Sequence, residues 1–119
     1  MILVDTSVWI DHLRAGDARL IELLKNFEVM SHPFVIGEIA CGNLENRKEI
    51  LSLLADLPQV TTATDSEVLF FIEQQQLMGQ GIGYIDAHLL ASVFLSRSIK
   101  LWTQDRRLKK VAKRMTLSY

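Results

Sequence analysis

The sequence predicts an α/β fold built around a mostly parallel central sheet. Short aliphatic runs that suit buried strands alternate along the chain with longer segments whose apolar residues recur at helical spacing. Strands that alternate with helices are typical of a parallel sheet covered by helices. The length of 119 residues suits a single domain over residues 1–119, and 49% hydrophobic with 23% charged residues is typical of a soluble globular protein.

The first half of the chain is predicted to contain two strands and four helices. "DTS" after the first aliphatic run is a helix-start signal, Pro33 suits a first helical turn because it lacks an N–H, and Pro58 stops a helix. In order, the expected elements are a strand at 2–4, a helix from "DTS" to about Leu13, a helix at 18–26, a strand at 28–31, a helix from Pro33 to 43 and a helix at 48–57.

The second half is predicted to begin with a strand at 59–63, "QVTTA". Thr64 and Glu67 then have the spacing of a capping box, in which each side chain satisfies a backbone N–H of the other, ahead of the apolar run "VLFFI". This helix is expected to end near Gly79, because glycine is favoured just past a helix. The remaining elements are a helix at 84–97, a strand at 99–103, a basic helix at 105–114 and a last short strand at 116–119.

Composition excludes several classes of protein. No apolar run approaches the roughly 20 residues that span a bilayer, and "MILVDTSVW" lacks the basic start of a secretory signal, so no membrane association is expected and the cytoplasm is the expected location. The single cysteine, Cys41, allows neither an internal disulfide framework nor a cysteine zinc cluster. Its apolar neighbours predict a small core residue.

Charge is distributed unevenly along the chain. The net charge is −1, yet residues 97–114 contain eight of the 13 basic residues against one acidic residue, a local charge of +7. A basic stripe of this kind suits binding to nucleic acid, and it equally suits a solvated helix face. Charge alone leaves both interpretations open.

Four acidic residues occupy unusual positions. Asp5 and Asp105 each follow a predicted strand, and the carboxyl ends of parallel strands share one edge of a sheet. Asp86 lies in the first turn of an otherwise apolar helix, and Glu38 is the only ionisable residue of "FVIGEIACG". Each has a separate structural explanation as a helix cap, a first-turn acid or an exposed residue. If they converge, their mutual repulsion favours a divalent cation, and oxygen ligands suit Mg²⁺ or Mn²⁺.

Other motifs are weaker. "GQGIGYID" follows a helix rather than a strand and lacks the third glycine of a phosphate-binding loop, so its glycines are expected to turn the chain between two helices. "ILVDTS" is similar to an aspartate phosphatase, but Ser7 replaces the second acid of that class. The three histidines are not expected to form a site: His12 and His32 are expected at the surface, and His88 lies about 200° around its helix from Asp86.

Four segments together resemble a known family. "VDTSVWIDHL", the isolated Glu38, "IDAHLLAS" and "TQDRRL" resemble the PIN-domain fold and, more narrowly, the VapC toxins of bacterial and archaeal toxin–antitoxin pairs. The resemblance covers almost the whole chain and implies a three-layer α/β/α sandwich and a Mg²⁺- or Mn²⁺-dependent endoribonuclease silenced by a small VapB-type antitoxin. The family's acidic site carries over to Asp5, Glu38, Asp86 and Asp105, with Thr103 as a hydroxyl in the same cluster.

The expected activity is therefore hydrolysis of RNA phosphodiester bonds, and structured RNA such as tRNA or ribosomal RNA is the expected substrate. Thr6 and Ser7 are expected to cap the helix backbone first and to support the acids second. The residues expected to contact the RNA backbone are Arg106, Arg107, Lys109 and Lys110. The resemblance also favours a homodimer. Two alternatives stay open: a non-catalytic module that binds RNA or the antitoxin, and a nuclease that acts on DNA.

Overall fold

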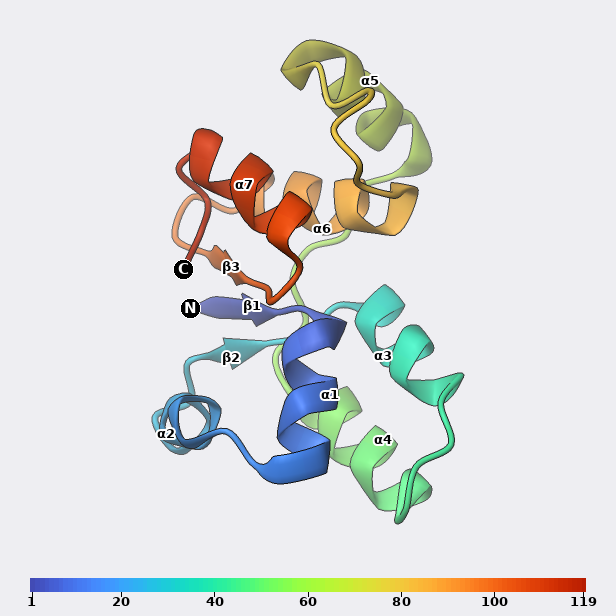
Figure 1. Ribbon diagram of the computed structural model, residues 1–119, viewed down its shortest axis with the longest axis vertical. Coiled ribbons are helices and arrows are strands. Elements are labelled where there is room, and N and C mark those ends of the chain that lie inside the picture. The colour runs from blue at the N-terminus through green and yellow to red at the C-terminus, as the bar shows by residue number, and fades with distance from the viewer.

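A three-stranded, all-parallel sheet lies at the centre of the computed structural model, which describes residues 1–119 (Figure 1). The middle strand is β1 (Ile2–Val4), which pairs with β2 (Val29–Met30) on one side and β3 (Lys100–Trp102) on the other. All three residues of β1 are buried. The prediction of a parallel sheet is confirmed.

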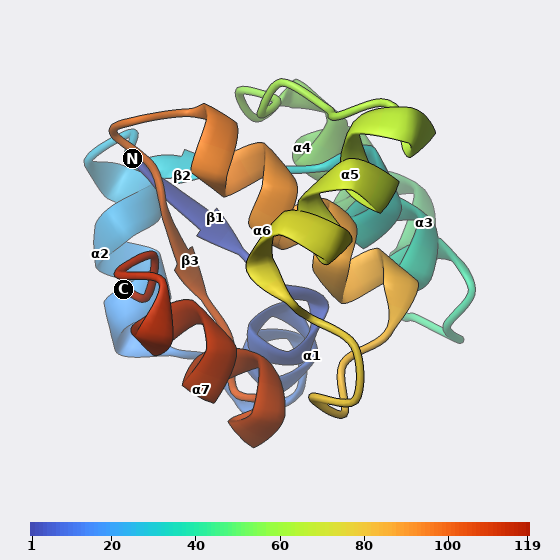
Figure 2. The ribbon, with the colours of Figure 1, turned by 90° about the horizontal axis from the view of Figure 1, so that it is seen from above.

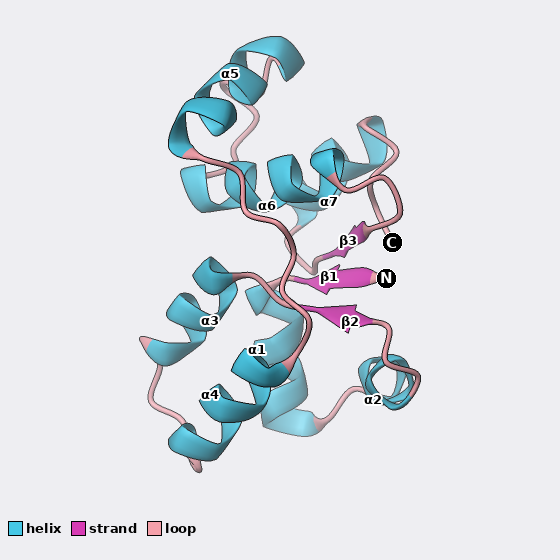
Figure 3. Cartoon of the chain, turned by 180° about the vertical axis from the view of Figure 1, so that it is seen from behind, coloured by secondary structure: helices cyan, strands magenta, loops and turns pink.

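Seven helices cover the two faces of this sheet. They are α1 (Thr6–Ala15), α2 (Ala18–Lys25), α3 (Pro33–Ala40), α4 (Arg47–Asp56), α5 (Asp65–Gln75), α6 (Tyr84–Leu95) and α7 (Arg106–Arg114). Figures 1 and 3 show α6 and α7 on one side of the strands with α5 beyond α6, and α1, α2 and α4 on the other side. Seen from above, β3 runs between α6 and α7 (Figure 2). The predicted three-layer α/β/α arrangement is confirmed.

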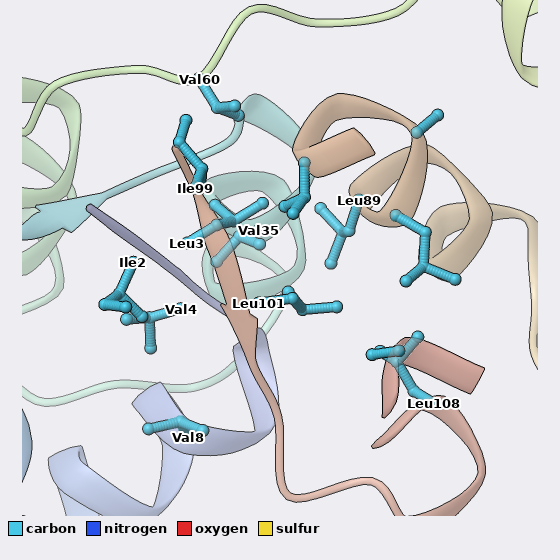
Figure 4. Close-up of a cluster of buried hydrophobic side chains, with 14 of the residues drawn as sticks. Ile2, Leu3, Val4, Val8, Val35, Val60, Leu89, Ile99, Leu101 and Leu108 are labelled. Carbon is cyan, nitrogen blue, oxygen red and sulfur yellow. The ribbon is translucent and has the colours of Figure 1, made fainter. Parts of the chain in front are cut away.

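The core is split between the two faces because successive side chains of a strand point to opposite sides. In Figure 4, Leu3 and Leu101 lie on the side of Leu89 from α6, whereas Ile2 and Val4 lie near Val8 from α1. Every residue from 87 to 93 of α6 is buried, since this helix is enclosed by the sheet and by α5. A helix that is apolar on all sides is expected to be buried in this way.

Two predicted strands are wrong, and one predicted helix is too long. Residues 59–63 contribute one isolated bridge, Ser31 to Gln59, and residues 116–119 contribute another, Leu101 to Ser118. In each of these segments only one residue pairs with a neighbouring part of the sheet, and the chain then leaves the sheet. The helix expected to reach Gly79 ends earlier, because Gln76 takes the left-handed conformation (φ 51°) at its end.

Burial of individual residues follows the sequence in part. Of the two adjacent phenylalanines of α5, Phe71 is buried and Phe70 is exposed, as expected when neighbouring helical residues point in different directions. The prediction that Cys41 is a core residue is wrong: it is exposed just after the end of α3, past the last buried position of that helix, Ile39. None of the seven helices combines the length and the apolar character needed to cross a membrane.

Candidate active site

Four carboxylates converge at the carboxyl edge of the sheet. Asp5 directly follows β1, and its N–H donates to the carbonyl of Trp102, the last residue of β3, at 2.9 Å. Asp105 follows β3 by three residues, so both acids leave the same edge. α3 contributes Glu38, and the first turn of α6 contributes Asp86. Element order predicted this juxtaposition, and the structure places Asp5, Asp105 and Glu38 near enough to Asp86 for their charges to raise its pKa.

Asp86 experiences the charges of the other three acids. Burial is the largest cause that raises its pKa, and the negative charges of Asp5, Asp105 and Glu38 raise the pKa further. The N–H of Gly83 donates to Asp86 Oδ2 at 3.1 Å and opposes this shift, because it stabilises the charged form. A half-buried carboxylate facing three like charges is under electrostatic strain that a bound cation would relieve.

Two hydroxyl groups hold the carboxylate of Asp5, which is only 6% exposed. Its Oδ2 accepts a hydrogen bond from Thr103 Oγ1 at 2.7 Å and another from Ser7 Oγ at 2.9 Å. Each hydroxyl in turn accepts a backbone N–H, that of Asp105 for Thr103 and that of Gln104 for Ser7, both at 3.0 Å. The loop after β3 is therefore fixed to Asp5, and Asp5 Oδ1 is left without a protein donor.

The expected capping role of Thr6 and Ser7 is wrong. The start of α1 has no hydrogen bond from a capping side chain. The hydroxyl of Thr6 instead donates to Glu38 Oε1 at 2.7 Å, which ties α1 to α3 across the site. Glu38 is exposed, yet this bond holds its carboxylate at the start of α1, and its charge is the smallest of the three that raise the pKa of Asp86. Both hydroxyls thus bind acids, which the sequence predicted only as their secondary role.

Asp105 both caps α7 and adds a negative charge next to Asp86. Its Oδ1 accepts the N–H groups of Arg107 (2.9 Å) and Leu108 (3.1 Å) and so caps α7. Its Oδ2 accepts no hydrogen bond from the protein and remains available. The cap therefore orients the carboxylate that also adds its charge to the cluster.

The donor set fits a hard divalent cation that keeps part of its water. No three acidic, histidine or cysteine side chains come close enough to bind one ion together. Mg²⁺ usually takes one or two carboxylates and completes its coordination with water and phosphate oxygens. An all-oxygen cluster in which Asp5 Oδ1 and Asp105 Oδ2 have no protein partner matches this need.

A basic face borders the acids. Its members on α7 are exposed and form no ion pair, since the only such contacts in the structure are Arg19–Glu22 and His88–Asp65. They are Arg106, Arg107, Lys109 and Lys110. The side chain of Arg107 lies over Gly81 in the loop before α6: a Cβ added at Gly81 would stand 2.6 Å from Arg107 Cδ. Arg107 therefore reaches from α7 toward the loop that ends at Gly83, directly before α6 and its first-turn residue Asp86.

Sequence reasoning missed a cluster of buried histidines. His32 was expected at the surface and is 1% exposed, because its Nδ1 accepts the N–H of Phe34 and caps α3 from inside. His88 is 2% exposed and points away from the acids, as expected, into contact with the rings of Phe34 and Tyr84. The position of His32 directly before Pro33, where an N-cap is expected, was the available signal.

Comparison with known proteins covers the same residues. The family model described as PIN domain matches residues 2–114, which include all four acids and the whole of α7. Two curated proteins from Mycobacterium tuberculosis, strains CDC 1551 / Oshkosh and ATCC 25618 / H37Rv, are each named Ribonuclease VapC32. Each is 53% identical to this chain over 109 residues, covering 92% of this chain and 88% of the relative.

Proposed function

This chain belongs to the PIN-domain family and within it to the VapC-type ribonucleases, and we propose that it is a metal-dependent endoribonuclease, the toxin of a type II toxin–antitoxin pair. The observation that carries this proposal is the convergence of Asp5, Glu38 and Asp105 on the half-buried Asp86. Such a cluster is costly without a cation, and with one it becomes a site for a phosphodiester.

Asp5, Glu38, Asp86 and Asp105 would hold one or two Mg²⁺ or Mn²⁺ ions, directly or through water. The bound ion supplies an acidified water and neutralises charge on the phosphoryl group. The protein's own contribution is positional: Ser7 and Thr103 fix Asp5, and Thr6 fixes Glu38. Attack of water in line with the departing 3′-oxygen would leave a 5′-phosphate and a 3′-hydroxyl.

The basic face of α7 would bind the RNA backbone. Arg106, Arg107, Lys109 and Lys110 are exposed and unpaired, so phosphate does not have to displace an internal carboxylate. Each phosphate contact with a single strand should contribute about −0.7 to the slope of log affinity against log salt. RNA loops present unstacked bases, so structured RNA such as tRNA or ribosomal RNA is the proposed substrate. The proposed place of action is the cytoplasm.

Two apolar surfaces support the proposed protein partners. The face formed by α5 and α6 exposes Phe70, Phe94 and Leu95, with exposed fractions of 67%, 48% and 52%, and we assign it to a homodimer. A groove between α1, α2 and α4 is lined by Trp9 and Leu53 among other apolar residues, and we assign it to the VapB-type antitoxin. An amphipathic helix laid in such a groove is a common mode of recognition.

Cleavage of RNA by the purified protein, freed of any bound partner, tests the proposed activity. Wild type with Mg²⁺ or Mn²⁺ should give discrete fragments with 5′-phosphates, and EDTA should abolish them. Asp86→Asn should lose at least about a hundredfold in rate, because it removes a carboxylate from the centre of the cluster. Asp11→Asn, an exposed acid of α1 outside the cluster, is the matched control and should cleave like wild type.

Four outcomes would contradict the proposal. Fragments that persist in EDTA would exclude a metal-dependent reaction. Equal cleavage by Asp86→Asn would place the chemistry elsewhere. RNA that is bound but never cut would identify a binding module, and cleavage of DNA in preference to RNA would identify a different nuclease.

A further inference from the structure

A polar cavity lies beside α6 at His88, which is about 200° around the helix from Asp86. It has a volume of about 460 Å³, within the range of about 300–1,000 Å³ that is usual for small-molecule sites. Its walls come from the starts of α3 and α5, from the segment between α4 and α5, and from α6. Its principal lining residues are His32, Phe34, Thr62, Thr64, Asp65 and His88.

The floor of this cavity contains polar atoms that have no partner in the protein. Neither ring nitrogen of His88 forms a hydrogen bond, although Nε2 lies 3.3 Å from Asp65 Oδ1, and Nε2 of His32 is equally without a partner. Both imidazoles are at least 98% buried. Buried polar groups in folded proteins almost always have a hydrogen-bond partner, so the lack of one in two adjacent side chains points to a ligand.

The available hydrogen-bonding groups can be assigned from their contacts. His32 Nδ1 accepts the N–H of Phe34 at 3.0 Å, and burial together with neighbouring His88 lowers the pKa of His32 to about 4. The ring is therefore neutral at pH 7 and carries its hydrogen on Nε2, which makes it a donor. Asp65 Oδ1 accepts the hydroxyl of Tyr84 at 3.0 Å, while Oδ2 accepts nothing and stands open as an acceptor.

Aromatic rings stand next to these groups. The ring of His88 contacts Phe34 at 4.7 Å and Tyr84 at 4.6 Å between centroids, and His32 contacts Phe34 at 5.1 Å. Phe34, which lines the cavity, is 37% exposed, so part of its ring is open to a ligand. Aromatic faces beside a donor and a carboxylate are the features by which proteins bind an unstacked base.

We propose that this cavity binds one nucleobase of the RNA substrate and that guanine is the base it fits. Guanine offers adjacent N–H groups to the free oxygen of Asp65 and a carbonyl oxygen to the N–H of His32. Adenine has neither the carbonyl nor the adjacent pair of N–H groups. A phosphate is disfavoured because the exposed Asp65 carboxylate would repel it, and because the N-terminal N–H groups of α3 and α5 are already capped.

This inference rests on the proposed function, because it takes the ligand from the RNA. α3 and α6 connect the cavity to the acids, since Glu38 follows Phe34 by one helical turn and Asp86 precedes His88 by two residues. Because His88 and Asp86 lie on nearly opposite sides of α6, the cavity and the acids should be separated by one helix diameter, roughly 10–12 Å. A single strand would therefore place there a base a few nucleotides from the cut phosphate.

Nuclear magnetic resonance of the imidazole groups tests the site without any cleavage. The chain has three histidines, so His12, which lies outside the cavity, is an internal control. Guanosine monophosphate should shift the signals of His32 and His88 and leave His12 unchanged, adenosine monophosphate should act more weakly, and inorganic phosphate should not act. Asp65→Asn should weaken the binding of guanosine monophosphate about tenfold. Glu73→Gln, which changes an exposed acid of the same helix, should leave this affinity unchanged.

Four results would overturn the inference: no shift at His32 and His88, an equal shift at His12, the same shift from phosphate alone, or equal responses to both nucleotides. In parallel, sequencing of RNA fragments should show guanine enriched at a fixed distance from the cut for wild type, and lose that enrichment for Asp65→Asn. Cleavage without enrichment in wild type would overturn the base site alone. Nucleotide binding by a protein that cuts no RNA would overturn the proposed function alone.

Discussion

Gly81 and Gly79 form a matched pair for testing whether the position of Arg107 matters. Both glycines have left-handed backbone, with φ of 77° and 70°, so alanine at either site costs roughly 1–2 kcal/mol of stability from strain. Their surroundings differ. A Cβ at Gly81 would lie 2.6 Å from Arg107 Cδ and 3.1 Å from its Nε, whereas a Cβ at Gly79 meets nothing within 4 Å.

Gly81→Ala should therefore displace the Arg107 side chain, because a flexible side chain yields more readily than backbone. Gly79→Ala should leave it in place at a similar cost in stability. If Arg107 holds a phosphate, Gly81→Ala should weaken RNA binding about three- to tenfold and reduce the salt slope by about 0.7. Gly79→Ala should change neither quantity.

Fluorescence anisotropy with a labelled RNA, at several salt concentrations and with the cation omitted, measures both quantities without cleavage. Arg107→Ala provides the limit for complete loss of the contact, and denaturant unfolding checks that the two glycine variants lose similar stability. Equal RNA affinity of Gly81→Ala and Gly79→Ala would refute the reasoning, and so would an Arg107→Ala protein with an unchanged salt slope.

Three further predictions concern the buried histidine, the hydroxyl that holds Asp5, and the α5–α6 face. Burial and neighbouring His88 lower the pKa of His32 from 6.5 to about 4. Between these two pH values the unfolded chain binds a proton at His32 that the folded chain does not bind. The free energy of unfolding should therefore be highest above pH 6.5 and should fall by about 3 kcal/mol as the pH is lowered to 4. His32→Asn, which can still accept the N–H of Phe34, should flatten that part of the curve of unfolding free energy against pH. Thr103→Val should lower the free energy of unfolding by about 1–3 kcal/mol, since a 2.7 Å hydrogen bond to a charged oxygen is lost, and cleavage of RNA should slow with it; an unchanged rate would show that Thr103 does not position Asp5 for the reaction. If the α5–α6 face forms the proposed homodimer, Phe70→Asp should shift the sedimentation of the protein from dimer to monomer, whereas Leu53→Asp in the α1–α2–α4 groove should not.

The sequence predicted the acidic cluster because strand order and sheet geometry limit where such residues can lie. Asp5 and Asp105 each follow a short aliphatic run, and parallel strands bring their carboxyl ends to one edge regardless of the details between them. The hydroxyls that fix these acids could not be assigned in the same way. Whether Ser7 caps α1 or bonds to Asp5 depends on a side-chain rotamer and on the loop after β3, and neither has a sequence signal.

Short-range context explains where the sequence misled. "QVTTA" has the composition of a strand, but only Gln59 bridges to Ser31, because the chain then turns away toward α5. Cys41 has apolar neighbours, yet the buried face of α3 ends at Ile39 and the cysteine falls just beyond it. Local composition indicates how a segment can fold, whereas its partners decide whether it does.

The helix α6 joins the two sites because of how its few polar residues are arranged. Its buried residues from Ala87 to Val93 are mostly apolar, and the chemistry is confined to its N-terminal part. Asp86 lies near the other carboxylates, and His88, two residues further along the helix, lines the cavity. Polar side chains that are buried or half-buried in such a helix are stable only where a neighbour or a ligand supplies their partners. For Asp86 we assign that role to a cation, and for the cavity lined by His88 to a base held by Asp65 and His32, so one rigid element would set the distance between the cut phosphate and the base that is read.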